Sequence, residues 1–224
     1  MKEAYYQPLA NLDNQLEYWN STGAEKTFRH PVNVQRVAQW LTTESRILDY
    51  GCGYGRCLAE LFEAGYRNLI GFDFSPAMIG AARSSFPEIS FEVVQSSTIP
   101  LSDASVDGAL LFSVLTCIPT DDGQRAIVKE LHRVLRPGGL LYISDLTLQT
   151  DERNLSRYAR DESKYRTYGV FDLPEGVTVR HHDPKWIKTL TSDFQTVALD
   201  RIEVMTMNEN PASAFQWFGL RTAK

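Results

Sequence analysis

The residues with the most specific chemical potential form a glycine-rich turn behind a short apolar run. Asp49 ends that run, and three glycines follow at alternate positions, Gly51, Gly53 and Gly55. Glycine tolerates left-handed backbone angles and has no side chain, so the amides of such a turn can approach a ligand closely. A helix that starts behind the turn directs its positive end at the same ligand. The segment predicts a strand, a turn and a helix that bind a nucleotide-like cofactor.

The spacing of the glycines discriminates between cofactors. The dinucleotide pattern G-x-G-x-x-G needs a glycine where this chain has Arg56, and no Gly-Lys-Ser or Gly-Lys-Thr run of a Walker loop occurs. The pattern instead resembles motif I of the class I S-adenosylmethionine-dependent methyltransferases, and the resemblance covers residues 46–146. It implies that S-adenosylmethionine is the cofactor and that it is bound by Asp49, the three glycines and Cys52, whose small side chain suits the turn.

A second carboxylate, Asp73, ends the next apolar run and precedes a proline at the start of a predicted helix. An acid in this place can accept hydrogen bonds from both ribose hydroxyls of a nucleoside, and we assign Asp73 this role. A helix N-cap formed by Asp73 or Ser75 is the alternative, and it is compatible with ribose binding. The resemblance implies that Met78 lies beside the adenosine, where Phe74 is also expected to pack.

The third and fourth predicted strands are followed by further cofactor candidates. Related methyltransferases usually carry an acid after the third strand that binds the adenine amino group, but this chain has Gln95 there, with Ser96 beside it. The Gln95 carbonyl can accept the same hydrogen bond, and a surface turn without a ligand has equal weight. The resemblance places Ser113 and Val114 along the methionine part of the cofactor.

The order of apolar runs predicts an α/β fold with a C-terminal hairpin. The resemblance implies a Rossmann-like sheet of seven strands, five parallel plus the antiparallel hairpin, with helices on both faces. Helices are expected over Val32–Leu41 and Asp121–Leu135, and the latter ends at a turn over residues 136–139. Trp217 and Phe218 are predicted to pack on opposite sheet faces. We interpret the chain as one methyltransferase domain with four segments: an N-terminal cap (1–45), the cofactor-binding core (46–146), a lid-like insertion (147–182), and a terminal helix and hairpin (183–224).

Four side chains are candidates for taking a proton from an acceptor. Imidazole titrates near neutral pH, so His181 and His182 come first, followed by Asp145 and Tyr6. Two adjacent histidines in extended chain point to opposite sides, so one of them is expected to face the site. A role without catalysis is the alternative for each. Thiol, neutral amine or aromatic nitrogen acceptors would need no base.

The segments that flank the core are expected to select the substrate. Tyr5, near the amino terminus, and Tyr168, in the insertion, are candidate contacts. Arg153, Arg157 and Arg160 recur at helical spacing, so one helix face could clamp a carboxylate or phosphate. Because acidic residues are interleaved with these arginines, a solvated, salt-bridged helix is the favoured alternative.

Composition narrows the class of protein. The chain has 224 residues, a net charge of −5 and a pI near 5.4, which argues against a nucleic-acid partner. Cys52, Cys57 and Cys117 lack metal-ligand spacing, so we expect reduced thiols and no metal. No apolar run reaches membrane-spanning length and the amino terminus does not resemble a signal peptide, so we expect a cytoplasmic protein without a membrane partner. A monomer or a homodimer is expected.

The function predicted from the sequence is methyl transfer from S-adenosylmethionine to a small-molecule acceptor whose nucleophile is oxygen, nitrogen or sulfur. Two other classes stay open. An RNA- or protein-directed methyltransferase would share every cofactor residue, although the N-P-P-Y type motif of many amide and base methylations is absent. A regulator that binds the cofactor without catalysis would share them too.

Overall fold

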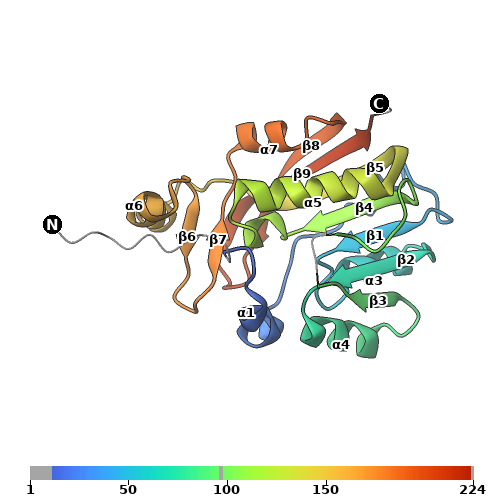
Figure 1. Cartoon of the computed structure of the whole chain (residues 1–224), viewed down its shortest axis with the longest axis horizontal. Helices are drawn as coiled ribbons and strands as arrows, with labels where there is room; N and C mark the ends of the chain where they lie inside the picture. The colour runs from blue at the N-terminus through green and yellow to red at the C-terminus, as the bar shows by residue number, and fades with distance from the viewer. Residues whose placement is uncertain (1–11, 96–97, 223–224) are drawn as a thin grey trace.

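A seven-stranded sheet in the order β3-β2-β1-β4-β5-β9-β8 organises the molecule (Figure 1). The computed structural model describes residues 12–95 and 98–222. Strands β1 to β5 run parallel, and β9 lies antiparallel between β5 and β8. The strands are β1 (Ile47–Tyr50), β2 (Leu69–Asp73), β3 (Ser90–Val93), β4 (Val106–Phe112), β5 (Leu135–Leu146), β8 (Phe194–Met205) and β9 (Pro211–Arg221). The predicted fold class and C-terminal hairpin are confirmed.

Helices cover both faces of this sheet and divide its core into two clusters. One face is covered by α5 (Asp121–Val134) and α7 (Pro184–Leu190). The other is covered by α2 (Val34–Val37), α3 (Arg56–Glu63) and α4 (Pro76–Ser85). Trp217 packs in the first cluster and its neighbour Phe218 in the second, so their predicted placement on opposite faces is confirmed.

Helix α5 shows how the sequence specifies an element. The Thr120 hydroxyl caps the helix by accepting the Gly123 amide at 3.0 Å. Ile127, Leu131 and Val134 recur at helical spacing and are buried against the sheet. The chain then enters β5 directly, so α5 and β5 form one connected unit beside β4.

Two elements differ from their predicted bounds. Helix α2 covers only residues 34–37, because the chain beyond it mixes three- and four-residue turns, such as the bonds from the Trp40 and Leu41 amides to the Val37 carbonyl. The expected turn at residues 136–139 lies inside β5: Leu135 pairs with Val106 and Leu140 with Gly108, so these four residues oppose a single residue of β4.

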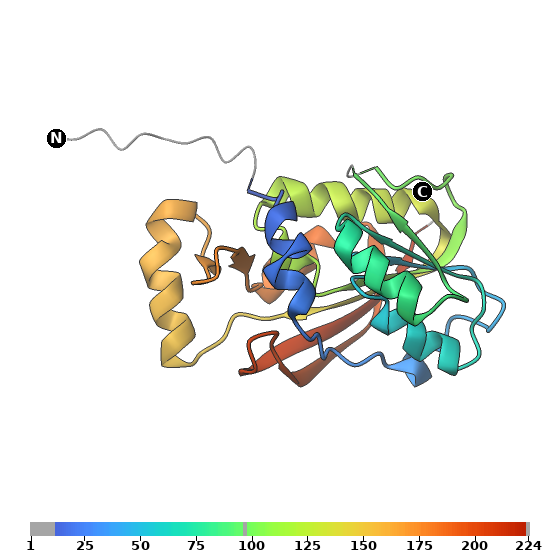
Figure 2. The same cartoon turned by 90° about the horizontal axis from the view of Figure 1, so that it is seen from below.

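A third layer lies beyond the carboxyl ends of the parallel strands. It contains α1 (Leu16–Asn20), η1 (Thr22–Glu25), η2 (Leu115–Cys117), α6 (Glu152–Tyr165) and the hairpin of β6 (Val170–Asp172) and β7 (Thr178–Arg180). Helix α1 lies between α4 and the hairpin (Figure 2). The Gln15 side chain joins these parts, because its amide donates to the carbonyls of Cys117 and Thr178 at 3.1 and 2.8 Å.

Candidate active site

The glycine turn joins β1 to α3 in left-handed backbone conformations. Gly51, Gly53 and Gly55 have φ angles of 74°, 53° and 86°. A Cβ atom would lie 2.3 Å from Val114 Cγ2 at Gly51, and 2.6 Å from the Phe91 ring at Gly55. Both positions therefore need glycine for backbone angle and for packing. Because α3 starts directly behind the turn, its positive N-terminal end adjoins the turn.

Asp73 fastens the turn to the end of β2. Its Oδ2 accepts the Gly53 amide at 2.9 Å, and its Oδ1 accepts the Ser75 amide at 2.8 Å. Burial raises the pKa of this carboxyl, and the amide hydrogen bonds oppose the rise. Ser75 is the N-cap of α4, since its hydroxyl accepts the Met78 amide at 3.2 Å. The capping interpretation is therefore realised, and it leaves Asp73 facing the site.

A cavity of about 860 Å³, which we call the large cavity, opens beside the turn. Ten of the sequence candidates line it: Asp49, Gly51, Cys52, Gly53, Asp73, Phe74, Met78, Gln95, Ser113 and Val114. Gly55 does not line it and instead packs behind it against Phe91. Ser96 lies outside the described residues. The structure thus gathers the ends of β1, β2, β3 and β4 around one space.

Asp49 is the least satisfied polar group of the large cavity. Its side chain is buried, and neither carboxylate oxygen has a hydrogen-bond partner among the described residues. Burial raises the pKa of Asp49 to about 7; Arg56 opposes the rise and Asp73 adds to it. Buried acceptors without protein partners fit a ligand that brings its own donors, such as the ammonium group of an amino acid. The residues present therefore fit the methionine part of S-adenosylmethionine.

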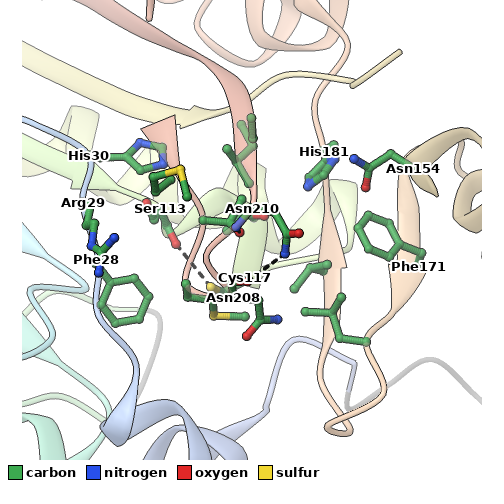
Figure 3. A pocket seen from close by; sticks show the side chains of 18 of the residues that line it. Phe28, Arg29, His30, Ser113, Cys117, Asn154, Phe171, His181, Asn208 and Asn210 are labelled. Carbon is green, nitrogen blue, oxygen red and sulfur yellow. Dashed lines mark hydrogen bonds between the residues drawn. The ribbon is translucent and has the colours of Figure 1, made fainter. Parts of the chain in front are cut away.

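A second cavity of about 80 Å³, which we call the small cavity, adjoins the first. The two cavities share the lining residues Trp19, Phe28, Ser113 and Cys117. Figure 3 shows Phe28, His30 and Ser113 on one side of the small cavity and Asn154, Phe171 and His181 on the other. Its walls come from the N-terminal segment, α6, β7 and the loop between β8 and β9. A ligand in the small cavity would meet the cofactor cavity across the shared wall.

His30 lies next to the shared wall. Its Nδ1 is 3.0 Å from the Ser144 hydroxyl, and the Ser113 amide donates to the Ser144 carbonyl at 2.8 Å. Ser144 therefore ties His30 to a residue that lines both cavities. Burial lowers the pKa of His30 to about 4, and the positive charge of Arg56 adds to this effect. The ring is uncharged at neutral pH.

His181, the first residue after β7, faces the small cavity, and its hydrogen bonding fixes its tautomer. The Tyr158 hydroxyl accepts the Gln149 amide at 3.1 Å and lies 2.6 Å from His181 Nδ1. Tyr158 is fully buried, so its hydroxyl proton needs an acceptor within the protein. Among the described residues that acceptor is His181 Nδ1, so the hydroxyl donates to Nδ1. Burial lowers the pKa of His181 to about 3. The neutral ring therefore carries its proton on Nε2.

His182 and Asp145 line neither cavity. His182 is fully buried with its Nε2 3.7 Å from Asp145 Oδ1, and both ring nitrogens lack hydrogen bonds among the described residues. Burial, with Arg180 and His181, lowers its pKa well below the usual value. The Asp145 carboxylate accepts the amides of Thr116 and Leu146 at 3.0 and 2.7 Å, and burial raises its pKa to about 7. These contacts hold the chain around η2 and the end of β5.

The predicted substrate residues separate into two groups. Arg153 and Arg157 line the small cavity from α6. Arg160 does not, because its guanidinium pairs with Asp161 and the Asp172 carbonyl. Tyr168 also lies outside the small cavity, 44% exposed, with its ring against Tyr158. Tyr5 and Tyr6 lie outside the described residues.

Sequence reasoning missed one wall of the small cavity. The end of β8 and the loop between β8 and β9 contribute Met205, Thr206, Met207, Asn208 and Asn210. The sequence presents these residues only as a hairpin turn, and nothing in their spacing indicates a site. The Asn208 side chain bonds Lys26 and Glu175 at 2.7 and 2.6 Å, so this loop is joined to the N-terminal segment and to the β6–β7 hairpin.

No group of three metal-ligating side chains occurs within residues 12–95 and 98–222. The helices of the same residues include none that is long and apolar enough to span a bilayer.

Comparison with known proteins defines the class to which this fold and site belong. The methyltransferase domain family matches residues 47–139. An uncharacterized methyltransferase of Mycobacterium bovis is 31% identical over 189 residues, covering 80% of this chain and 73% of that protein. An O-methyltransferase of Aspergillus sclerotiorum is 28% identical over 153 residues, covering 64% of this chain and 57% of that protein. The crystal structure of an S-adenosylmethionine-dependent methyltransferase from Methanosarcina mazei has a TM-score of 0.80 at 24% identity, covering 87% of this chain and 99% of that chain.

The chain belongs to the class I S-adenosylmethionine-dependent methyltransferases. The resemblance of the glycine turn to motif I is thereby confirmed, as is the cofactor that it implies. The chain spans about half the length of several relatives that it matches, from 40% to 57%.

Proposed function

We propose that this protein transfers the methyl group of S-adenosylmethionine to a small-molecule acceptor bound in the small cavity. The observation that carries the proposal is the wall of Trp19, Phe28, Ser113 and Cys117 that the two cavities share. Transfer is an in-line displacement, so acceptor and donor must meet across a boundary of this kind. Holding them in that geometry can contribute about 7 to 11 kcal/mol.

S-adenosylmethionine supplies a methyl group activated by a positively charged sulfonium. We assign the free carboxylate of Asp49 to its ammonium group and Asp73 to its ribose hydroxyls. Gln95 is our candidate for the adenine amino group, while Phe74 and Met78 pack against the adenosine. All five residues line the large cavity.

Aromatic rings over the shared wall would exclude water from the transfer. Trp19 and Phe28 have ring centroids 6.1 Å apart, and Phe28 and Tyr54 have theirs 6.0 Å apart. The Tyr54 hydroxyl accepts the Phe28 amide at 3.1 Å, which fixes the N-terminal segment over the glycine turn. Faces of aromatic rings also attract cations such as a sulfonium.

His30 is our proposed proton acceptor for a hydroxyl nucleophile. It is uncharged at neutral pH and is tied through Ser144 to Ser113, on the side of the small cavity where the methyl donor is expected. His181, the first candidate from the sequence, presents a donor on Nε2 because its Nδ1 accepts from Tyr158. We therefore assign His181 to binding and His30 to proton transfer.

Oxygen is our proposed acceptor atom. The relative from Aspergillus sclerotiorum is an O-methyltransferase. A hydroxyl must lose its proton on methylation, and a neutral histidine beside the shared wall suits that step.

The proposal is tested by incubating the protein with radiolabelled S-adenosylmethionine and separate pools of metabolites, RNA and protein. We expect label in the metabolite pool. Label in RNA or protein would replace the proposal by the macromolecule-directed alternative.

The premise of cofactor binding is tested separately by calorimetric titration with S-adenosylhomocysteine. Binding without transfer to any pool would favour the regulator that binds the cofactor without catalysis. Absence of binding would contradict the assignment of the large cavity.

A further inference from the structure

The small cavity has an unusual charge pattern. Among the described residues, its lining includes three arginines, Arg29, Arg153 and Arg157, and no aspartate or glutamate. The two histidines among its lining residues, His30 and His181, both have lowered pKa values and are neutral at pH 7. Arg29 is 3.5 Å from Glu209 and Arg153 is 3.7 Å from Asp151, whereas Arg157 has no salt bridge among the described residues. A partly buried arginine without a salt bridge, beside two further arginines, fits a ligand that brings negative charge.

Arg157 is the arginine of this lining that has no salt bridge within the described structure. Its guanidinium donates to the neutral Asn154 Oδ1 at 3.3 Å and lies 5.4 Å from the centre of the Phe171 ring. No salt bridge joins Arg157 to a carboxylate of the described residues. Burial and the like charges of Arg153 and Arg160 lower the pKa of Arg157, and the charges of Asp151 and Glu175 oppose them. An anion in the small cavity would add a direct partner for this guanidinium.

Arg153 lies one helical turn before Arg157 on α6 and has spare capacity as well. Its Nε is buried and makes no hydrogen bond within the described structure. The nearest Asp151 oxygen is 3.7 Å from that nitrogen, which is beyond hydrogen-bond length. Two guanidinium groups at i and i+4 therefore offer donors to one ligand group.

His181 adds a third donor from a different element. The Tyr158 hydroxyl occupies its Nδ1 at 2.6 Å, so the Nε2 proton is the one available to a ligand. His181, Arg153 and Arg157 all line the small cavity. The charges of the two arginines lower the pKa of His181, and Asp151 opposes them. Arg153, Arg157 and His181 thus present hydrogen-bond donors on one wall of the small cavity.

We infer that the acceptor is a small organic anion whose carboxylate or phosphate is bound by Arg153, Arg157 and His181, while a separate nucleophile faces Ser113 and Phe28. The inference rests on the proposed methyl transfer in the small cavity. Neither arginine lines the large cavity, so the anionic group is held away from the methyl donor. Figure 3 shows His181 and Asn154 across the small cavity from Ser113 and Phe28. The methylated atom is therefore not in the anionic group.

The test separates a metabolite extract of the source organism by ion exchange into anionic, neutral and cationic fractions before the reaction. Each fraction is then incubated with the protein and radiolabelled S-adenosylmethionine. We expect label in the anionic fraction. Treating that fraction with a phosphatase distinguishes the two chemistries, because it removes a phosphate acceptor and leaves a carboxylate acceptor.

Arg157→Gln supplies the site-specific arm, with Arg153→Gln as a second variant if the first does not fold. The loss of one charge-assisted contact should raise KM for the active fraction about 10- to 100-fold. Arg160→Gln is the matched control, because Arg160 lies on the same helix but outside the small cavity. Calorimetric titration with S-adenosylhomocysteine should give the same affinity for all these proteins.

The outcomes separate the inference from the proposed function. Label in the neutral or cationic fraction, or an unchanged KM in both α6 variants, would overturn the anionic acceptor and leave small-molecule methyl transfer standing. Label in no fraction, with S-adenosylhomocysteine bound normally, would count against the proposed function and the inference together.

Discussion

The two cavities of this protein have opposite charge. Asp13, Asp49, Asp73 and Asp122 line the large cavity, where Arg56 is the single basic residue of the described lining and pairs with Glu60. The described lining of the small cavity has arginines and no acid. Between them lies an uncharged wall that includes Trp19 and Phe28.

This difference suits two ligands of opposite charge. Carboxylates in the large cavity favour a cofactor that carries an ammonium and a sulfonium. Arginines in the small cavity favour an anionic acceptor and repel the cofactor, so each ligand is directed to its own side of the shared wall. The charge pattern would thus sort the ligands before any contact between reacting atoms.

The largest expected effect comes from removing the proposed base at the shared wall. For a hydroxyl acceptor, His30→Gln should lower kcat about 10²- to 10⁴-fold, because glutamine cannot take the proton. His181→Gln keeps a donor near the Nε2 position and should mainly raise KM.

Steady-state kinetics of both variants across pH tests this division of roles. Wild-type activity should fall as the pH drops through about 4, where His30 becomes protonated, and the remaining activity of His30→Gln should not show that fall. A larger loss of kcat in His181→Gln would return the base to His181.

The next largest effect concerns the large cavity alone. Asp73→Ala should weaken cofactor binding by about 2 to 4 kcal/mol, since it strands two ribose hydroxyls and frees the Gly53 amide of the turn. Calorimetric titration with S-adenosylhomocysteine measures the loss. Asp73→Asn keeps one oxygen acceptor, so its affinity for S-adenosylhomocysteine should lie between those of wild type and Asp73→Ala. An unchanged affinity in Asp73→Ala would refute the ribose assignment.

The state of His181 in the small cavity can be tested through the pH dependence of protein stability. The pKa of His181 is about 3 in the folded protein against 6.5 in the unfolded chain, so the unfolded state binds more protons between these values. The contribution of His181 to the free energy of unfolding is therefore fully present above pH 6.5 and is lost as the pH falls towards 3. It amounts to about 2 to 3 kcal/mol between pH 7 and 4.5.

Urea unfolding of wild type and His181→Gln at both pH values measures this contribution as a difference between the proteins. Asp49 and Asp145, whose pKa values are raised to about 7, act in the opposite direction, since their contribution is lost as the pH rises. They are present in both proteins and cancel in the comparison. Equal pH dependence in the two proteins would show that His181 does not titrate in this way.

The smallest expected effect is at the adenine side of the large cavity. Gln95→Ala should weaken binding of S-adenosylhomocysteine by about 0.5 to 1.5 kcal/mol, the value of one neutral hydrogen bond. Calorimetry with Asp73→Ala as the reference checks this order. A loss as large as that of Asp73→Ala would show that Gln95 carries the role of the missing acid.

The cofactor candidates of the large cavity were predictable because each belongs to a short segment. The glycine turn follows β1, Asp73 ends β2 and Ser113 follows β4, and these strands end at the same sheet edge, so strand order alone brings them together. The small cavity was not predictable in this way. His30 and its partner Ser144 are 114 positions apart, and the loop between β8 and β9 carries no motif.

Helical spacing shows the same limit within one element. It predicted a shared face for Arg153, Arg157 and Arg160, but Arg160 pairs with Asp161 and leaves only the other two at the small cavity. The roles of the adjacent histidines also depended on the fold. Their alternation along the extended chain was predictable, whereas the Tyr158 hydroxyl that makes His181 a donor comes from a different element.

The sequence by itself determined the cofactor and the sheet, because apolar periodicity, left-handed glycines and strand-end carboxylates act over a few residues. Only the tertiary structure decided which side chains surround the acceptor. That cavity is closed by the N-terminal segment, α6, β7 and the β8–β9 loop, and no local pattern fixes how four distant segments pack against one another. The charged side chains that line it come from separate segments, and only folding brings them together.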